Sequence, residues 1–452
     1  MRMRLAKQKR AGVHSSAESW YFAFARKGWA YWLLAGVFSS LAIYCGYYVD
    51  THHMFLQPRY WIFARLEGLQ RRPRPASRTL SVKITDSEFY DDRKEALPFA
   101  GRRPLRREVL AKLVGAIALA DPAVIAIDVD FRSPHPSAPP EEFDLYRHED
   151  EVLWKTICEI VTKGNTSVVL TKALWSDNDG VIADSSIYDG QTTCVFPTTR
   201  VSYGYAAVPF DTRKIPPPLK LANGDTVDSF PVAIVRAYLH EEQTVGSAGR
   251  SGRDSSPARG YLSNLRLDSA DGGELPFGSF VNPNPIAPLS ASDALHCVQH
   301  GGCATLAHSI VIISGDWHEL AANRGEFADT HLTPAGIISG GDLVVNWVEA
   351  ILSGEVRYPL PEWLRLVPDA IFVLLLYYAV LVDRSLAWRI SFLVLTLSVL
   401  AVGAWLLFQT AAVFFDVFPI TLSIAIHLLF ERLYGMEHRQ TIRAPRQAKR
   451  GY

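Results

Sequence analysis

Four apolar runs constrain the fold of this chain more than any other feature of its sequence. One lies near the start and three lie near the end, at residues 28–49, 366–382, 390–408 and 411–430. Because a helix rises about 1.5 Å per residue, each run can cross a hydrocarbon core of about 30 Å. We therefore predict four transmembrane helices, with a polar segment at residues 50–362 between the first and the second.

The distribution of charge predicts which side of the membrane each segment occupies. Residues 1–27, the loop between the second and third runs, and the tail at 431–452 together hold 15 basic and 4 acidic residues. The whole chain has 46 of each kind, which leaves 31 basic against 42 acidic residues for the remainder. Basic flanks stay in the cytoplasm. We expect a bacterial inner-membrane protein with both termini cytoplasmic, the segment 50–362 periplasmic and the first run an uncleaved signal anchor.

The polar segment alternates between strand and helix patterns. Strands are predicted at 80–85, 123–129, 167–170 and 309–314, and helices at 105–120, 148–163, 230–240 and 341–352. Alternation of this kind is typical of a parallel sheet with right-handed crossovers. The predicted fold class is therefore α/β, with a mainly parallel sheet flanked by helices, in addition to the four membrane helices.

Two of the five cysteines, Cys297 and Cys303, are close in sequence. In an oxidising compartment a disulfide that closes a short loop is the plainest interpretation. The alternative is a metal site that adds His296, His300 or His308, although the spacing matches no standard zinc pattern. We favour the disulfide and predict no metal and no cofactor.

Acidic residues follow two predicted strands, and we expect those strands to be neighbours in the sheet. Asp86 follows the first strand, and Asp128 and Asp130 end the second. The carboxyl ends of parallel strands form ligand crevices, and residues two apart on a strand share a face, so these acids could bind a cation or an amine. The alternative is structural, with the acids capping turns or pairing with basic neighbours. Those neighbours are Arg103, Arg106 and Arg107.

Three polar residues, Asp329, His331 and Thr333, form a second candidate site for a ligand. A catalytic role is disfavoured because no serine lies in a nucleophile elbow, and a turn stabilised by Asp329 is the simpler interpretation. Asp416 lies within the fourth apolar run, close to its outer end, where we expect an interfacial role rather than a proton relay. We predict that the protein is not an enzyme.

The order of motifs in the polar segment resembles that of the second type of CHASE domain. The motifs are VKITDS at 82–87, RPLRR at 103–107, IAIDVDF at 125–131, SDAL at 292–295, IVIISG at 310–315, DTHLTPAG at 329–336, GGDLVVN at 340–346 and ILSG at 351–354. The resemblance implies an extracellular sensory domain of the kind associated with bacterial cyclases and histidine kinases. It also implies one span before the domain and three after it, as hydropathy indicates independently.

These features together predict an inner-membrane sensor that detects a small molecule or another envelope signal. The tail is too short for a catalytic output domain, so we expect the signal to pass through the spans to a separate cytoplasmic or membrane partner. The expected partners are the lipid bilayer, an unknown extracytoplasmic ligand and a second copy of the chain, and no nucleic acid. The alternative is an envelope assembly protein whose outer domain binds another protein without signalling.

Overall fold

The computed structural model describes a little under three fifths of the chain. The described residues are 37, 44, 48, 52, 54–69, 77–91, 97–101, 105–131, 140–177, 180–183, 200–246, 257–264, 277–280, 288–301, 303–317, 329–360, 364, 386–416 and 421. The chain divides into two compact units. One unit consists of residues 1–59 and 359–452, and the other of residues 60–358.

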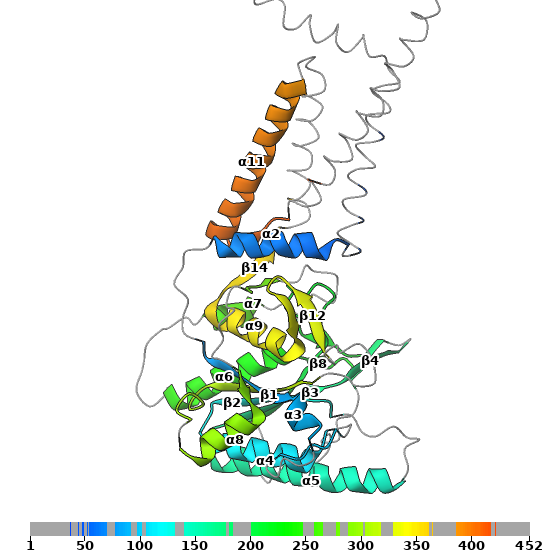
Figure 1. The fold of residues 1–452 in the computed structure, drawn as a ribbon, viewed down its shortest axis with the longest axis vertical. Coiled ribbons are helices and arrows are strands. Elements are labelled where there is room, and N and C mark those ends of the chain that lie inside the picture. The colour runs from blue at the N-terminus through cyan, green and yellow to red at the C-terminus, as the bar shows by residue number, and fades with distance from the viewer. Residues whose placement is uncertain are drawn as a thin grey trace, which may run out of the picture. The chain divides into compact units, whose positions relative to one another are not determined.

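A six-stranded parallel sheet lies at the centre of the 60–358 unit (Figure 1). Its order is β10-β1-β11-β2-β3-β6, and each neighbouring pair is parallel. The strands are β1 (Thr79–Thr85), β2 (Val124–Asp128), β3 (Ser167–Lys172), β6 (Val201–Tyr205), β10 (Leu289–Ser290) and β11 (Ile310–Asp316). The predicted mainly parallel sheet is confirmed.

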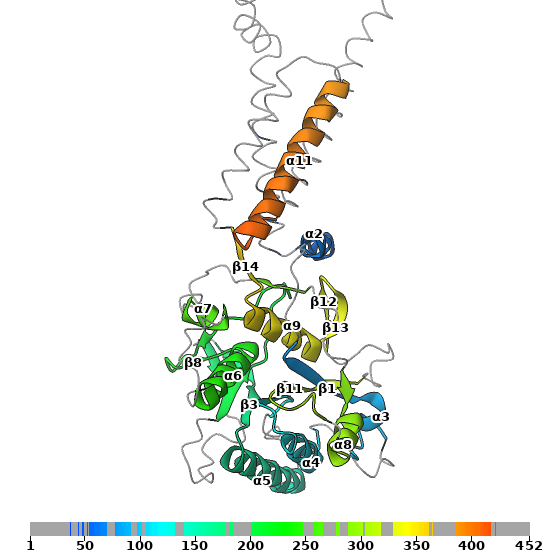
Figure 2. The same ribbon diagram turned by 90° about the vertical axis from the view of Figure 1, so that its left-hand side faces the viewer.

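The middle strands are apolar on both faces because helices cover both sides of the sheet. Residues 310–314 of β11 and 124–127 of β2 are buried without a break. On one face lie α4 (Arg107–Ala118), α5 (Pro140–Lys163) and α8 (Ala291–Gln299), and on the other lie α6 (Phe230–Gly246) and α9 (Gly340–Ser353) (Figures 1 and 2). This three-layer packing explains why the strands have no polar face to mark one side as solvent-exposed.

Local sequence explains where the main helices begin and end. Buried residues of α4 recur at helical spacing, from Val109 and Leu110 to Leu113 and Val114, and form one apolar face. The Ser339 hydroxyl caps α9 by accepting a hydrogen bond from the Asp342 amide. Gly354 ends the same helix with φ of 70°, a conformation that favours glycine.

Shorter elements surround the sheet. They are α2 (Leu56–Gly68), α3 (Asp86–Phe89), α7 (Pro257–Asn264), β4 (Leu174–Asp177), β5 (Gly180–Ala183), β7 (Leu219–Lys220), β8 (Thr226–Val227), β9 (Phe277–Gly278), β12 (Thr330–Thr333), β13 (Gly336–Ser339) and β14 (Val356–Pro359). The strands β12 and β13 form an antiparallel hairpin that leads directly into α9. This hairpin carries two of the sequence-predicted site residues.

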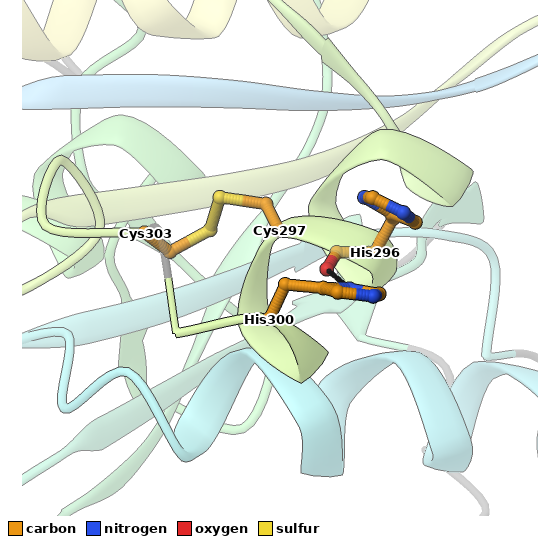
Figure 3. The surroundings of a disulfide bond; sticks show 4 residues. All are labelled: His296, Cys297, His300 and Cys303. Atoms are coloured by element: carbon orange, nitrogen blue, oxygen red, sulfur yellow. Dashed lines mark hydrogen bonds between the residues drawn. A yellow bond between two sulfur atoms is a disulfide. The ribbon is translucent and has the colours of Figure 1, made fainter.

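The predicted disulfide joins Cys297 near the end of α8 to Cys303 in the loop that follows (Figure 3). Both thiols are therefore consumed, and the alternative of a metal site built on them is wrong. His296 and His300 instead stack on each other, with ring centroids 4.1 Å apart. Cys158 on α5 is also disulfide-bonded.

The other unit contains α11 (Leu386–Thr410) and β15 (Val413–Phe414). The predicted span 390–408 falls within α11, whereas residues 413–414, at the predicted start of the fourth span, are extended. Most of the predicted spans at 28–49, 366–382 and 411–430 lies outside the described residues. Within the described part of the chain, no helix combines the length and hydropathy needed to cross a membrane.

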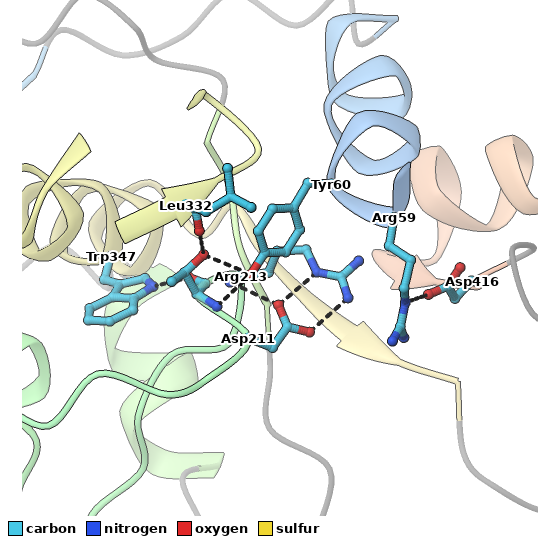
Figure 4. Close-up of polar contacts among 8 residues, drawn as sticks. Arg59, Tyr60, Asp211, Arg213, Leu332, Trp347 and Asp416 are labelled. Carbon is cyan, nitrogen blue, oxygen red and sulfur yellow. Dashed lines mark hydrogen bonds and ion pairs between the residues drawn. The ribbon is translucent and has the colours of Figure 1, made fainter. Parts of the chain in front are cut away.

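A small apolar cluster and a buried ion pair stabilise this unit. Leu360, Ala404 and Phe415 form the cluster. The Arg59 Nε donates to the Asp416 Oδ2 at 2.5 Å, and both side chains are largely buried (Figure 4). Asp416 thus has a cationic partner 357 residues away in the sequence. No pattern in the sequence predicts this pairing.

Candidate functional site

Three polar side chains lie side by side where the sheet meets the start of α9. Lys83 of β1 is in register with Ser314 of β11, and Ser314 is in register with Asp128 of β2. Register partners share a face of the sheet. The row therefore faces the N-terminus of α9, at the carboxyl edge where α/β sheets place ligands.

Two glycines allow α9 to approach this row closely. A Cβ atom at Gly341 would overlap the Ser314 hydroxyl, and one at Gly340 would overlap the Asp329 carboxylate. The Gly340 amide also donates to the Asp329 carbonyl at 3.0 Å. The Gly-Gly pair thus packs the helix start against the strand ends, and Asp329 occupies the N-terminal end of α9, where a negative charge is favourable.

A small pocket opens beside Asp128, with a cavity volume of about 30 Å³. That is room for one or two water molecules, or for the charged head of a small ligand. Asp128 and Asp329 form its acidic end, and most of the remaining wall is apolar or aromatic. The other lining residues are Tyr205, Ala206, Ala207, Val208, Pro216, Phe230, Pro231, Gly340, Val344 and Trp347.

The environment of Asp128 raises the pKa of its carboxyl to about 7. Burial is the largest cause, and the negative charge of Asp329 adds to it, while His331 opposes it. Among the described residues no hydrogen bond or ion pair reaches this carboxylate. A carboxyl group of this kind is poised to lose its proton when a cation arrives.

Lys83, at the other end of the row, is already paired. Its ammonium lies 2.7 Å from the Asp342 Oδ2 and 3.1 Å from the Asp316 Oδ2. Burial alone would lower the pKa of Lys83, but the hydrogen bonds and charges of Asp342 and Asp316 together raise it. Lys83 therefore ties β1 and β11 to the first turn of α9 and does not neutralise Asp128.

The second sequence-predicted cluster divides between the pocket and a turn. Asp329 lines the pocket, and its Oδ1 lies 2.6 Å from the His331 Nε2. Thr333 instead closes the β12–β13 turn, donating to the Gly336 carbonyl at 2.8 Å and accepting from the Ala335 amide. Asp329 and His331 thus lie near Asp128. The predicted turn is stabilised by Thr333 and not by Asp329.

The first predicted cluster is largely separated. The expectation that β1 and β2 are neighbours is wrong, because β11 pairs with both of them. Asp86 begins α3 after β1 and does not line the pocket. The strand β2 ends at Asp128, so strand alternation does not place Asp130, which is exposed and lies outside the pocket lining.

The described part of the basic cluster lies on the opposite side of the sheet from the pocket. Arg107, on α4, is buried, and its guanidinium donates to the Asp130 carbonyl and lies 3.4 Å from the Asp150 Oδ1. Arg106 binds the Pro98 carbonyl and the Glu108 carboxylate. Arg103 lies outside the described residues. Both described arginines thus have structural partners other than the Asp128 carboxylate.

One contact network connects the pocket to α2, and sequence reasoning missed it. Trp347, in the pocket wall, donates from its indole nitrogen to the Thr212 carbonyl at 3.2 Å (Figure 4). The Thr212 hydroxyl donates to the Leu332 carbonyl of β12 at 2.7 Å. The Tyr60 hydroxyl of α2 accepts from the Thr212 amide at 3.1 Å. Thr212 therefore joins α9, the hairpin and α2.

A buried ion pair holds this network in place. Arg213 is 0% exposed and makes a two-point contact with Asp211, with the Nε and Nη2 atoms donating at 2.9 and 2.7 Å. The Arg213 guanidinium also lies 5.1–5.7 Å from the ring centroids of Tyr60, Phe63 and Phe277. The ion pair and the aromatic contacts of Arg213 therefore restrict the backbone of the neighbouring Thr212.

The fold and the pocket define an α/β domain, and the described pocket combines two acids with a wall that is mostly apolar or aromatic. The sequence model of the CHASE2 domain family matches residues 41–382, most of the chain, and the chain belongs to this family of extracellular sensory domains. No curated protein and no solved structure gives a significant match. The predicted resemblance is confirmed.

Proposed function

We propose that this protein is a membrane-anchored sensor whose pocket beside Asp128 binds the protonated head of a small amine. Occupancy of the pocket would be passed through Trp347 and Thr212 to α2. The spans would then carry the signal to a separate partner. The single observation that carries the proposal is the Asp128–Asp329 pocket, with its aromatic wall in direct contact with the Thr212 network.

The lining of the pocket supports a cationic ligand. Two carboxylates at one end attract positive charge, whereas the only ammonium in the row, that of Lys83, is already paired with Asp316 and Asp342. Tyr205, Phe230 and Trp347 supply aromatic surface of the kind that binds ammonium groups. A cavity volume of about 30 Å³ favours a small ammonium head over a bulkier one.

The position of Thr212 supports transmission to α2. Its carbonyl binds α9, its hydroxyl contacts both β12 and α2, and its amide binds α2, so a small shift of Trp347 changes a residue that Tyr60 contacts twice. The residue before Tyr60 is Arg59, whose partner is Asp416. The helix α2 is therefore continuous between a residue held by the sensory unit and a residue held by the other unit.

The apolar runs and the charge distribution of the sequence support the membrane topology. In this proposal residues 28–49, 366–382, 390–408 and 411–430 cross the inner membrane, with the sensory unit in the periplasm. Several apolar side chains of α11 point outward, with Leu395 61% and Val399 63% exposed. Such side chains suit contact with lipid.

Calorimetric titration of the full chain with methylammonium chloride tests the ligand class. We expect binding by methylammonium, and much weaker binding by tetramethylammonium, which is too large for the pocket. Asp128→Asn should abolish the binding, because it removes the charge and keeps the shape of the side chain. Glu151→Gln, at a surface carboxylate of α5 that is 61% exposed, is the matched control. Equal titration curves for parent and Asp128→Asn would contradict the proposal.

A further inference from the structure

Large apolar side chains are exposed unevenly on the 60–358 unit. Its described residues include seven such side chains, and two of these, Leu69 and Leu119, lie at helix ends. The other five surround the Thr212 network. These five form what we call the apolar patch: Trp61 (61% exposed), Phe210 (70%), Leu332 (41%), Ile337 (73%) and Tyr358 (43%).

The patch residues come from four segments: α2, the loop before Thr212, the β12–β13 hairpin and β14. Trp61 follows Tyr60, which binds Thr212, and Phe210 lies two residues before Thr212. The Leu332 carbonyl accepts from the Thr212 hydroxyl, and Leu332 is in register with Ile337. Tyr358 follows Arg357, which pairs with Phe277 beside Arg213. The segments that carry the exposed side chains thus meet around Thr212 and Arg213.

The unit runs from Tyr60 to Tyr358, and the patch includes its second residue, Trp61, and its last, Tyr358. The apolar run 28–49 ends about ten residues before the unit, and the run 366–382 begins about ten residues after it. At about 3.4 Å per residue, the connecting chain reaches at most about 35 Å. A bilayer crossed by those runs would therefore lie within reach of the patch.

The composition of the patch matches a membrane–water interface. Tryptophan and tyrosine are enriched at the level of lipid headgroups, because their rings are apolar and their tips are polar. The Arg65 guanidinium lies 5.3 Å from the Trp61 ring centroid and adds a cation that can bind a lipid phosphate. We propose that the apolar patch rests in the headgroup region of the outer leaflet of the inner membrane, so that the sensory unit contacts lipid directly.

This inference rests on the proposed membrane topology, and one experiment separates the two. The full chain, with Cys45→Ser, carries a polarity-sensitive dye at Ile337→Cys or, as the control, at Leu119→Cys. Leu119 is 81% exposed at the end of α4, on the other face of the sheet. Each labelled protein is placed, one copy per particle, in lipid nanodiscs that contain a nitroxide lipid labelled near the headgroup.

We expect the nitroxide lipid to remove most of the emission at position 337 and almost none at position 119. Emission at 337 that matches the control in protein incorporated into the discs would overturn the lipid contact. Quenching at 337 only when a second copy is present would also overturn it, in favour of an interface between copies. Failure of the protein to enter nanodiscs would overturn the topology, and the lipid contact with it.

Discussion

Replacing Asp128 by Asn should change the pH dependence of stability in a defined direction. Burial raises the pKa of Asp128 from 3.8 to about 7 in the folded protein. Between those values the folded state holds a proton that the unfolded state has lost. Stability therefore falls as the pH rises from about 4 to about 7, and the whole loss is present above pH 7. The Asn variant has no such loss.

The size of the effect follows from the shift of about three units. At about 1.4 kcal/mol per unit the upper bound is about 4 kcal/mol, and partial exposure of the carboxyl reduces this to about 1–4 kcal/mol. For a unit of this size, 1 kcal/mol corresponds to roughly 2 °C in the melting temperature. We expect Asp128→Asn to melt about 2–8 °C higher than the parent at pH 8, and within about 1 °C of it at pH 4.

Thermal unfolding of the full chain in detergent, followed by circular dichroism from pH 4 to pH 8, measures this difference. Glu151→Gln is the control, because an exposed carboxylate in an i,i+4 pair contributes at most about 0.5 kcal/mol at any pH. A melting difference between Asp128→Asn and the parent that does not change with pH would refute the reasoning. So would a variant that is less stable than the parent at pH 8.

Three further predictions concern the network, the disulfide and the topology. Asp211→Asn should destabilise the protein by about 3–5 kcal/mol by leaving Arg213 buried and unpaired, and adding Arg213→Met should restore much of the loss in chemical denaturation. If the double variant does not regain stability, the loss in Asp211→Asn does not come from the unpaired charge of Arg213. Replacing Cys297 and Cys303 by Ser should cost about 2 kcal/mol, and peptide mass spectrometry without reduction should show the bridge; free thiols in oxidising buffer would contradict it. Reporter tags at residues 5 and 448 should be cytoplasmic and a tag at residue 250 periplasmic; a cytoplasmic signal from residue 250 would end the four-span topology.

Local patterns predicted the core of the sensory unit well, because each main element has a clear periodicity. The strand β11 was expected at 309–314 and occurs at Ile310–Asp316. The helix α5 begins at Pro140, eight residues before the expected start. Its signal was present, since proline followed by Glu141 and Glu142 is a typical first turn.

The order of the strands could not be read from the sequence. The crossover from β1 to β2 leaves space for one strand between them. The strand β11, which lies about 180 residues after β2 in the sequence, occupies that space. That insertion separates Asp86 from Asp128. It also places α9 over the strand ends, and so brings Asp329 to Asp128.

The contacts of the Thr212 network could not be predicted from the sequence either. Tyr60 and Thr212 are 152 residues apart, and Thr212 and Trp347 are 135 apart. Such contacts depend on tertiary packing, and no periodicity within a single sequence reports them. The motif at 340–346 did mark the start of α9, but not the reason for its two glycines, which is the close approach to Ser314 and Asp329.

Hydrogen–deuterium exchange measures whether occupancy of the pocket reaches α2. The full chain in nanodiscs is compared with and without methylammonium chloride, with Asp128→Asn as the reference. We expect slower exchange around Thr212 and along α2 in the parent when methylammonium is present, and no change in the variant. Protection confined to the pocket, or identical protection in Asp128→Asn, would contradict it.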